Sequence, residues 1–224
     1  MKVKTYTETH YRFVDGLHEL TKERPELKRI DKYILSLWLY ESGFFSSKLA
    51  REHNNVGGMK WRPGCPVPHG LVEYKDWEGK TEHYFSVPSP EIYAHVWHWF
   101  ITRNKRYQPF FSSVDAGESG PGCIRDLVFA GYCTAIANSE RNPEVLESWA
   151  REMDINSVID DEKTEQDIIA INYARRVWII ANRPDTEDLL NCRWLDKTAN
   201  QFGKSCEIEI PEWAKLYGIE RGGE

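Results

Sequence analysis

The chain has 224 residues, of which 41% are hydrophobic and 29% charged, a composition typical of a globular protein and not of a disordered or fibrous one. Its 29 Lys and Arg residues against 35 Asp and Glu residues give a net charge of −6, which argues against a nucleic-acid partner, because phosphate binding favours clustered basic side chains. The longest stretch without a charged residue, Leu127–Ser139, is shorter than the ~20 residues that a membrane-spanning helix needs, so the sequence excludes a membrane span.

The first predicted helix covers Arg29–Tyr40. Its apolar side chains recur at the spacing of one helical face, at Ile30, Tyr33, Ile34, Leu37 and Trp38. Gly43 follows shortly afterwards and is a natural place for this helix to end.

A β-hairpin and a second helix are predicted next. Two β-prone runs, Leu71–Lys75 and Lys80–Val87, flank a short turn that contains glycine, as is typical of a hairpin. Ser89 followed by Pro90 is typical of a helix start, with a capping hydroxyl and a proline in the first turn. We expect this helix to extend to about Arg103.

The second half of the chain is predicted to be helical apart from one loop. Ser112–Gly122 has the composition of a loop, and Ile124–Ala137 and Asn142–Met153 are predicted helices. The polar, acidic segment Asp154–Lys163 marks a domain boundary. Further helices are predicted beyond it, at 168–180, 186–200 and 211–217.

Glu41 is the first candidate for chemistry, because it continues the inward-facing stripe of the first predicted helix. At this position the carboxyl group should be partly desolvated and close to the helix C-terminus, where the macrodipole disfavours negative charge. Both effects raise the pKa of a carboxyl group, as a general acid that works near neutral pH requires. Periodicity alone allows equally well a glutamate that turns outward as the helix ends.

Two segments around Glu41 match a known pattern in residue types and spacing. Residues 41–50 read ESGFFSSKLA, and residues 54–60 read NNVGGMK. Together they resemble the glucosaminidase domain, family seventy-three of the glycoside hydrolases, whose pattern is ESG, a Ser shortly before Leu-Ala, and a segment close to NNLFGIK. The resemblance, over about residues 10 to 153, implies a lysozyme-like α+β fold with a small β-hairpin lobe. We therefore expect a domain of this kind over residues 1–153 and a C-terminal helical extension over 154–224.

The resemblance also implies roles for individual residues. Glu41 would be the general acid that protonates the glycosidic oxygen of the departing sugar. Members of the family carry a second glutamate in a hairpin, in a Thr-x-Glu-Tyr context, and Glu73 takes that place here, although Leu71 replaces the usual Thr. A further departure lies at Val56-Gly57, where the family prefers a bulky pair. Substrate binding is expected of Ser47, Asn54, Asn55 and Tyr132.

Alternatives stay open for the second carboxyl group. Glu78 and Glu82 of the predicted hairpin compete with Glu73, since a glutamate on a wet strand face is usually only solvated. When the two carboxyl groups lie ~5 Å apart, one of them can attack the sugar and form a covalent glycosyl-enzyme intermediate. When they lie ~6.5–9.5 Å apart, a water molecule fits between them and attacks directly, which inverts the configuration at the anomeric carbon. The substrate's own 2-acetamido group is a third candidate nucleophile. Glu73 as the base that activates water is the leading interpretation.

Other kinds of site have weaker support. His95 and His98 lie three residues apart on a predicted helix but lack a third ligand and an HExxH pattern, so we expect them at the surface or an interface, without a metal. The sequence contains no GK[ST] phosphate loop and no Gly-x-Ser-x-Gly motif, which leaves nucleotide and acyl-transfer chemistry unsupported. We therefore expect no cofactor.

The sequence favours a peptidoglycan hydrolase, an endo-β-N-acetylglucosaminidase that cuts the β-1,4 bond after N-acetylglucosamine. The alternatives are a muramidase or lytic transglycosylase on the same fold, and a non-catalytic wall-docking component of a phage tail or injection machine. No secretory signal is visible at the N-terminus. We therefore expect delivery to the cell wall or periplasm by a phage particle, an injection device or cell lysis. Residues 154–224 favour an additional protein partner.

Overall fold

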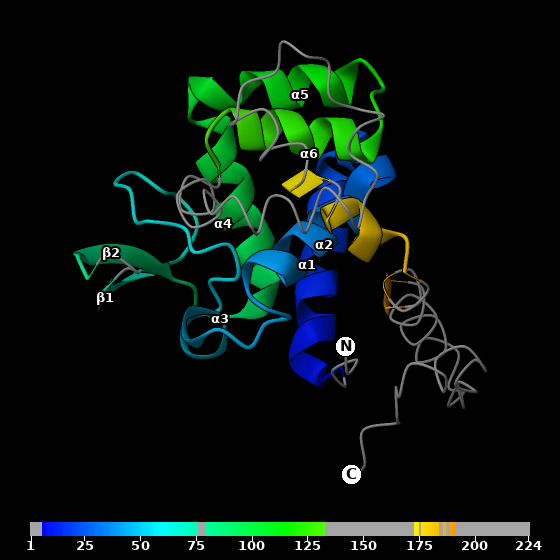
Figure 1. Ribbon diagram of the computed structural model, residues 1–224. Helices are drawn as coiled ribbons and strands as arrows, with labels where there is room; N and C mark the ends of the chain where they lie inside the picture. The colour runs from blue at the N-terminus through cyan, green and yellow to red at the C-terminus, as the bar shows by residue number, and fades with distance from the viewer. Residues whose placement is uncertain are drawn as a thin grey trace, which may run out of the picture. The chain divides into compact units, whose positions relative to one another are not determined.

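The computed structural model of the protein describes residues 6–75, 79–132, 173–174, 176–183, 186 and 189–190 (Figure 1). These residues form a mainly helical structure with one two-stranded antiparallel sheet, which confirms the predicted mainly helical α+β class. No helix within these ranges is long and apolar enough to cross a membrane. The elements in chain order, with η for a 3-10 helix, are α1 (Glu8–Glu23), η1 (Pro25–Ile30), α2 (Asp31–Glu41), α3 (Lys48–His53), β1 (Gly70–Lys75), β2 (Thr81–Ser86), α4 (Pro90–Thr102), η2 (Lys105–Tyr107), α5 (Gln108–Asp115) and α6 (Gly120–Phe129).

The chain divides into two compact units. Met1–Arg103 together with Ile180–Glu224 form the first unit, and Asn104–Ile179 form the second. In the first unit the guanidinium group of Arg183 lies 5.8 Å from the centre of the Phe44 ring, so part of the predicted C-terminal extension packs against the segment that follows Glu41. The described residues of the helices predicted at 168–180 and 186–200 are helical. The predicted boundary at residue 153 and the helices predicted at 142–153 and 211–217 lie outside the described residues.

Helix α1 is an element that the sequence analysis does not predict. Most of its residues are charged or polar, and its buried face is narrow: Phe13, Val14, Leu17 and Leu20 are at most 1% exposed. Their spacing is nevertheless the i, i+1, i+4, i+7 pattern of a helix with one buried side. At its N-terminus, Nδ1 of His10 accepts a hydrogen bond from the backbone N–H of Thr7 at 3.0 Å.

Helix α2 begins two residues later than predicted, because the 3-10 helix η1 precedes it. The helix is buried on more than the predicted stripe, since every residue from Ile34 to Leu39 is fully buried. The Trp38 ring contacts two aromatic rings of α4 edge-on, Tyr93 with ring centres 5.0 Å apart and Trp97 with centres 5.7 Å apart. These contacts fix the C-terminal half of α2 in the core of the first unit.

Helix α4 begins after Ser89, as predicted, although the Ser89 side chain makes no capping hydrogen bond. It crosses α1 closely at Gly16, where an added Cβ atom would lie 2.2 Å from the carbonyl oxygen of Glu91. Arg12 donates two hydrogen bonds to the Glu91 carboxylate beside this crossing, at 2.6 and 3.1 Å. The absence of a side chain at Gly16 therefore allows the two helices to meet.

The predicted hairpin is confirmed, with β1 and β2 paired from Gly70 opposite Ser86 to Lys75 opposite Thr81. Because side chains alternate between the faces of a strand, the register decides which residues share a face. Lys60, which follows α3 and precedes the hairpin in sequence, forms an isolated antiparallel bridge with Tyr84 of β2. This bridge joins the hairpin to the segment after α3.

The second unit corrects the prediction of a loop over Ser112–Gly122. Helix α5 extends to Asp115, and α6 begins at Gly120, so only a short turn separates them. Two features outweigh the loop-like composition: the Ser119 hydroxyl accepts a hydrogen bond from the Gly122 N–H at 3.2 Å, and Pro121 occupies the first turn. Helix α6 ends at Phe129 and not at the predicted Ala137, which lies outside the described residues.

Candidate active site

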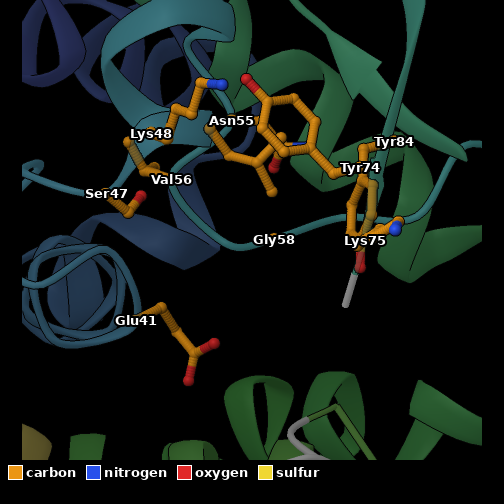
Figure 2. A pocket seen from close by; sticks show the side chains of 10 residues that line it. Glu41, Ser47, Lys48, Asn55, Val56, Gly58, Tyr74, Lys75 and Tyr84 are labelled. Atoms are coloured by element: carbon orange, nitrogen blue, oxygen red, sulfur yellow. The ribbon is translucent and has the colours of Figure 1, made fainter. Parts of the chain in front are cut away.

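Glu41 is the last residue of α2 and is half-buried. Its carboxylate extends away from the helix into a pocket of the first unit (Figure 2). The residues before it are held in the core, so the position of Glu41 follows from the packing of α2. The structure thus agrees with the inward-facing interpretation of the periodicity.

The turn after Glu41 has an unusual backbone, with three consecutive left-handed residues. The φ angles of Gly43, Phe44 and Phe45 are 58°, 58° and 60°. A non-glycine residue in this region is strained by about 1–2 kcal/mol. Ring contacts hold Phe45 there, because it packs against His10 and Phe13 with ring centres 4.9 and 4.6 Å apart.

Ser42 is the hydrogen-bonding centre of this turn and is 1% exposed. Its hydroxyl donates to the carbonyl of Trp38 at 2.6 Å and accepts the N–H of Phe45 at 2.8 Å. The ESG sequence therefore has a local explanation: the glutamate ends the helix, the serine fastens the turn, and Gly43 adopts a positive φ angle with little strain.

Replacing Ser42 by Ala should lower the free energy of unfolding by about 1–3 kcal/mol, because both buried hydrogen bonds are lost and the Phe45 N–H is left without its acceptor. Urea unfolding followed by circular dichroism measures the change. Ser46→Ala is the matched control in the same turn, since its exposed hydroxyl donates to Gly43 at 2.6 Å, and we expect a loss below about 1 kcal/mol. Equal losses for the two variants would contradict the role given to Ser42.

Ser47 and Asn55 both line the pocket, and both also hold the backbone. The Ser47 hydroxyl caps α3 by accepting the N–H of Ala50 at 3.2 Å. Asn55 is 1% exposed, and its amide nitrogen donates to the carbonyls of Met59 at 2.9 Å and Phe85 at 3.0 Å, while its oxygen accepts the Met59 N–H at 2.8 Å. Both amide hydrogens of Asn55 are therefore used within the protein.

Asn54 does not belong to the lining residues of this pocket. It ends α3 in a left-handed conformation, with a φ angle of 50°, and its amide nitrogen donates to the carbonyl of Val87 at 2.8 Å. The two asparagines thus bind the segment after α3 to the C-terminal end of β2. Their contacts are structural, and the predicted contacts with substrate stay a prediction.

The hairpin contributes tyrosines to the pocket. Tyr74 and Tyr84 line it and lie on the same face of the hairpin, because Tyr74 pairs with Glu82 and Tyr84 pairs with Val72. Neither tyrosine was predicted as a site residue, although the alternation of the two strands contains the necessary signal. The register places Tyr74 on the face of the hairpin that bears Tyr84, and Tyr84 is only 7% exposed.

Glu73 lies on the opposite face of the hairpin from these tyrosines. It is paired in register with His83, and its carboxylate lies 2.9 Å from Nε2 of that histidine. The side chain of Glu73 is 62% exposed and is not among the lining residues of the pocket. The structure therefore does not bring Glu73 together with Glu41.

The pocket has a volume of about 290 Å³ and is open on one side. Figure 2 shows Glu41 and Ser47 on one side of it, Tyr74 and Lys75 across from them, and the Val56–Gly58 segment between. The complete lining consists of Glu41, Ser47, Lys48, Leu49, Asn55, Val56, Gly58, Tyr74, Lys75 and Tyr84. The lining thus combines one carboxylate, that of Glu41, with the two tyrosines Tyr74 and Tyr84.

A small polar network holds Tyr74 in place. Its hydroxyl donates to the Glu52 carboxylate at 3.0 Å, and the ammonium group of Lys48 lies 5.0 Å from the centre of its ring. Burial, together with the hydrogen bond to Glu52, raises the pKa of Tyr74 above its ordinary value. The hydroxyl therefore stays protonated and acts as a donor.

Tyr132 belongs to the second unit, where its ring contacts Tyr107 with ring centres 6.2 Å apart. Its predicted contact with the sugar stays a prediction.

The two histidines of α4 make contacts that are not those of a metal site. Nδ1 of His95 lies 3.7 Å from the Glu23 carboxylate, and burial lowers the pKa of His98 to about 4, so that His98 is neutral at pH 7. Within the described ranges, no group of three or more His, Cys, Asp or Glu side chains is arranged to hold a metal ion.

Comparisons of the chain with protein-family models, with curated proteins and with solved structures found no match.

Proposed function

We propose that the protein is a glycoside hydrolase that cleaves the glycan strand of peptidoglycan after N-acetylglucosamine, with Glu41 as general acid. The observation that carries this proposal is the position of Glu41, half-buried at the end of α2 and exposed to a pocket walled by Tyr74 and Tyr84. The resemblance of the segments around residues 41–60 to the glucosaminidase domain supplies the substrate class.

The environment of Glu41 suits an acid catalyst. The last turn of α2 carries no basic residue, so the negative end of the helix dipole is not offset there by a cation of the same turn. A helix C-terminus in general disfavours negative charge, and a protonated carboxyl group is the form that can donate a proton to a glycosidic oxygen. Tyr74 and Tyr84 supply flat apolar faces against which a pyranose ring can pack.

As the nucleophile we propose the carbonyl oxygen of the substrate's 2-acetamido group: it attacks the anomeric carbon while Glu41 protonates the departing glycosidic oxygen, and water then opens the cyclic intermediate. Among the lining residues Glu41 is the sole carboxylate, and Glu73 is turned away and paired with His83. A substrate with its own nucleophile does not require a protein carboxylate as the nucleophile. Glu73 as a base would require the hairpin to rearrange.

Product analysis tests the proposed reaction. Purified sacculi are digested with the full-length protein, and the released muropeptides are analysed by mass spectrometry after reduction with borohydride. We expect fragments that end in reduced N-acetylglucosamine. Ends in N-acetylmuramic acid would identify a muramidase, and anhydro-muramic ends a lytic transglycosylase. If no fragment is released, the protein is a wall-docking component instead of a hydrolase.

A further inference from the structure

The described part of the chain between residues 180 and 190 is packed and not solvated. Five of its side chains are at most 8% exposed, namely Ile180, Ala181, Thr186, Leu189 and Leu190. The sequence led us to expect this stretch in an extension outside the candidate domain, yet it belongs to the first unit, as Glu41 does. Its contacts within that unit therefore bear on the candidate site.

A turn within this stretch holds the backbone of Arg183. The Arg183 N–H donates to the carbonyl of Ile180 at 3.0 Å, and the Arg183 carbonyl accepts the N–H of Thr186 at 3.1 Å. The Thr186 hydroxyl, which is 0% exposed, donates to the same Ile180 carbonyl at 2.7 Å. Because its N–H and its carbonyl are both bonded, Arg183 projects its side chain from a fixed point.

The side chain of Arg183 reaches the turn that follows Glu41. Its guanidinium group lies 5.8 Å from the centre of the Phe44 ring, within the ~6 Å at which a cation is attracted to an aromatic face. Phe44 is the third residue after Glu41 and has a left-handed φ angle of 58°. A non-glycine residue keeps such a conformation only where its surroundings hold it.

Helices α1 and α2 hold the backbone of Phe44. Its N–H donates to the carbonyl of Leu39 in α2 at 2.6 Å, and its carbonyl lies 3.4 Å from Nε2 of His10 in α1. Because Nδ1 of His10 accepts the Thr7 N–H, a neutral His10 ring carries its proton on Nε2 and donates it to Phe44. The backbone of Phe44 is thus held by the start of the chain, and its ring is contacted by residue 183.

We infer that Arg183 is a positioning residue for Glu41, acting through the ring of Phe44. The inference rests on the proposed function and adds a residue 142 positions away in sequence to the machinery of the acid. When the Phe44 ring loses its cation, the strained turn relaxes more often, and Glu41 at the adjoining helix end is in place for less of the time. A contact of this kind is worth about two- to fivefold in an equilibrium constant.

Amide hydrogen exchange tests the contact without requiring turnover. In the full-length Arg183→Met protein we expect the amides of Phe44 and Phe45 to exchange about two- to fivefold faster than in wild type, as measured by NMR. Methionine keeps an unbranched side chain in place but removes the charge over the ring. Arg183→Lys keeps a cation and should restore the slow exchange.

Two further variants show where Arg183 acts. Arg106→Met makes the same replacement in the second unit, where the guanidinium group of Arg106 lies 5.1 Å from the centre of the Tyr107 ring, and exchange at Phe44 should not change. Phe44→Leu removes the ring that Arg183 contacts. In that background the addition of Arg183→Met should have no further effect, because there is no ring left to contact.

Steady-state kinetics on a defined glycan fragment give the functional measurement. Arg183 does not line the pocket, so Arg183→Met should lower kcat by about two- to fivefold, leave KM unchanged, and be rescued by Arg183→Lys. Unchanged exchange or unchanged kcat in Arg183→Met, no rescue by lysine, an equal effect of Arg106→Met, or a further effect in Phe44→Leu would overturn the inference. The expected exchange pattern in a wild-type protein that releases no muropeptides would count against the hydrolase proposal alone.

Discussion

Replacing Glu41 by Gln should lower the rate of peptidoglycan hydrolysis by a factor of about 10²–10⁴, the range that general acid catalysis contributes. The amide keeps the size and hydrogen-bonding capacity of the side chain but has no proton to donate to the leaving oxygen. A turbidity assay on purified sacculi, with wild type and Glu41→Gln at equal concentration, measures the effect. Because the side chain lies at the end of α2 and is half-buried, the variant should fold with an unchanged circular dichroism spectrum.

Glu73→Gln is the matched control for this experiment. Glu73 is exposed and lies on the face of the hairpin away from the tyrosines, so its replacement should change the rate by no more than about threefold. A loss as large as that of Glu41→Gln would restore Glu73 as the catalytic base and would show that the hairpin rearranges on substrate binding. Wild-type activity in Glu41→Gln would refute the acid role.

Gly16→Ala should lower the free energy of unfolding by about 3 kcal/mol, the upper end of the usual cost of overpacking. The new Cβ atom would lie 2.2 Å from the carbonyl oxygen of Glu91, and a backbone atom cannot yield as a flexible side chain does. The greater helix propensity of alanine, worth about 1 kcal/mol, is too small to offset the displacement of α4. In a chain of this length the midpoint of thermal unfolding should fall by about 6–12 °C.

Gly70→Ala provides the comparison, because it makes the same chemical change at the start of β1. There the added Cβ atom would lie 3.5 Å from Cβ of Ser86, an ordinary van der Waals contact, and we expect a change within about 0.5 kcal/mol. Differential scanning calorimetry of both variants gives the two values. A small effect of Gly16→Ala would mean that the crossing of α1 and α4 is looser than the structure indicates.

Much of the fold of the first unit was predictable, because its strongest signals are local. Helix α2 follows from the spacing of its apolar residues, and the hairpin from two β-prone runs around a turn. Helix α1 was harder to recognise, since the four large apolar residues of its buried face, Phe13, Val14, Leu17 and Leu20, lie among polar and charged ones. The start of α6 at Gly120 resembles a loop in composition, and the contact that makes it helical is a side-chain cap from Ser119.

The candidate site was predictable in part, for a geometric reason. The position of Glu41 depends on the period of one helix, which the sequence contains. The face of the hairpin on which Glu73 lies depends on the strand register. A shift of the register by one residue would move Glu73 to the other face. Tyr74 therefore lines the pocket, where the resemblance led us to expect its neighbour Glu73. The hydrogen bond of Asn55 to Phe85 joins segments about thirty residues apart in sequence and has no local signal.

The side chain of Asn55 has a consequence for engineering. Its amide group bonds to both the N–H and the carbonyl of Met59, so it fixes the ends of the loop Val56–Gly58. Loop length is thereby constrained, and composition is constrained at two positions as well, because Val56 is 1% exposed and Gly58 has a φ angle of 57° that favours glycine. Gly57 is therefore the position of this loop at which a substitution, at constant loop length, can redesign the pocket.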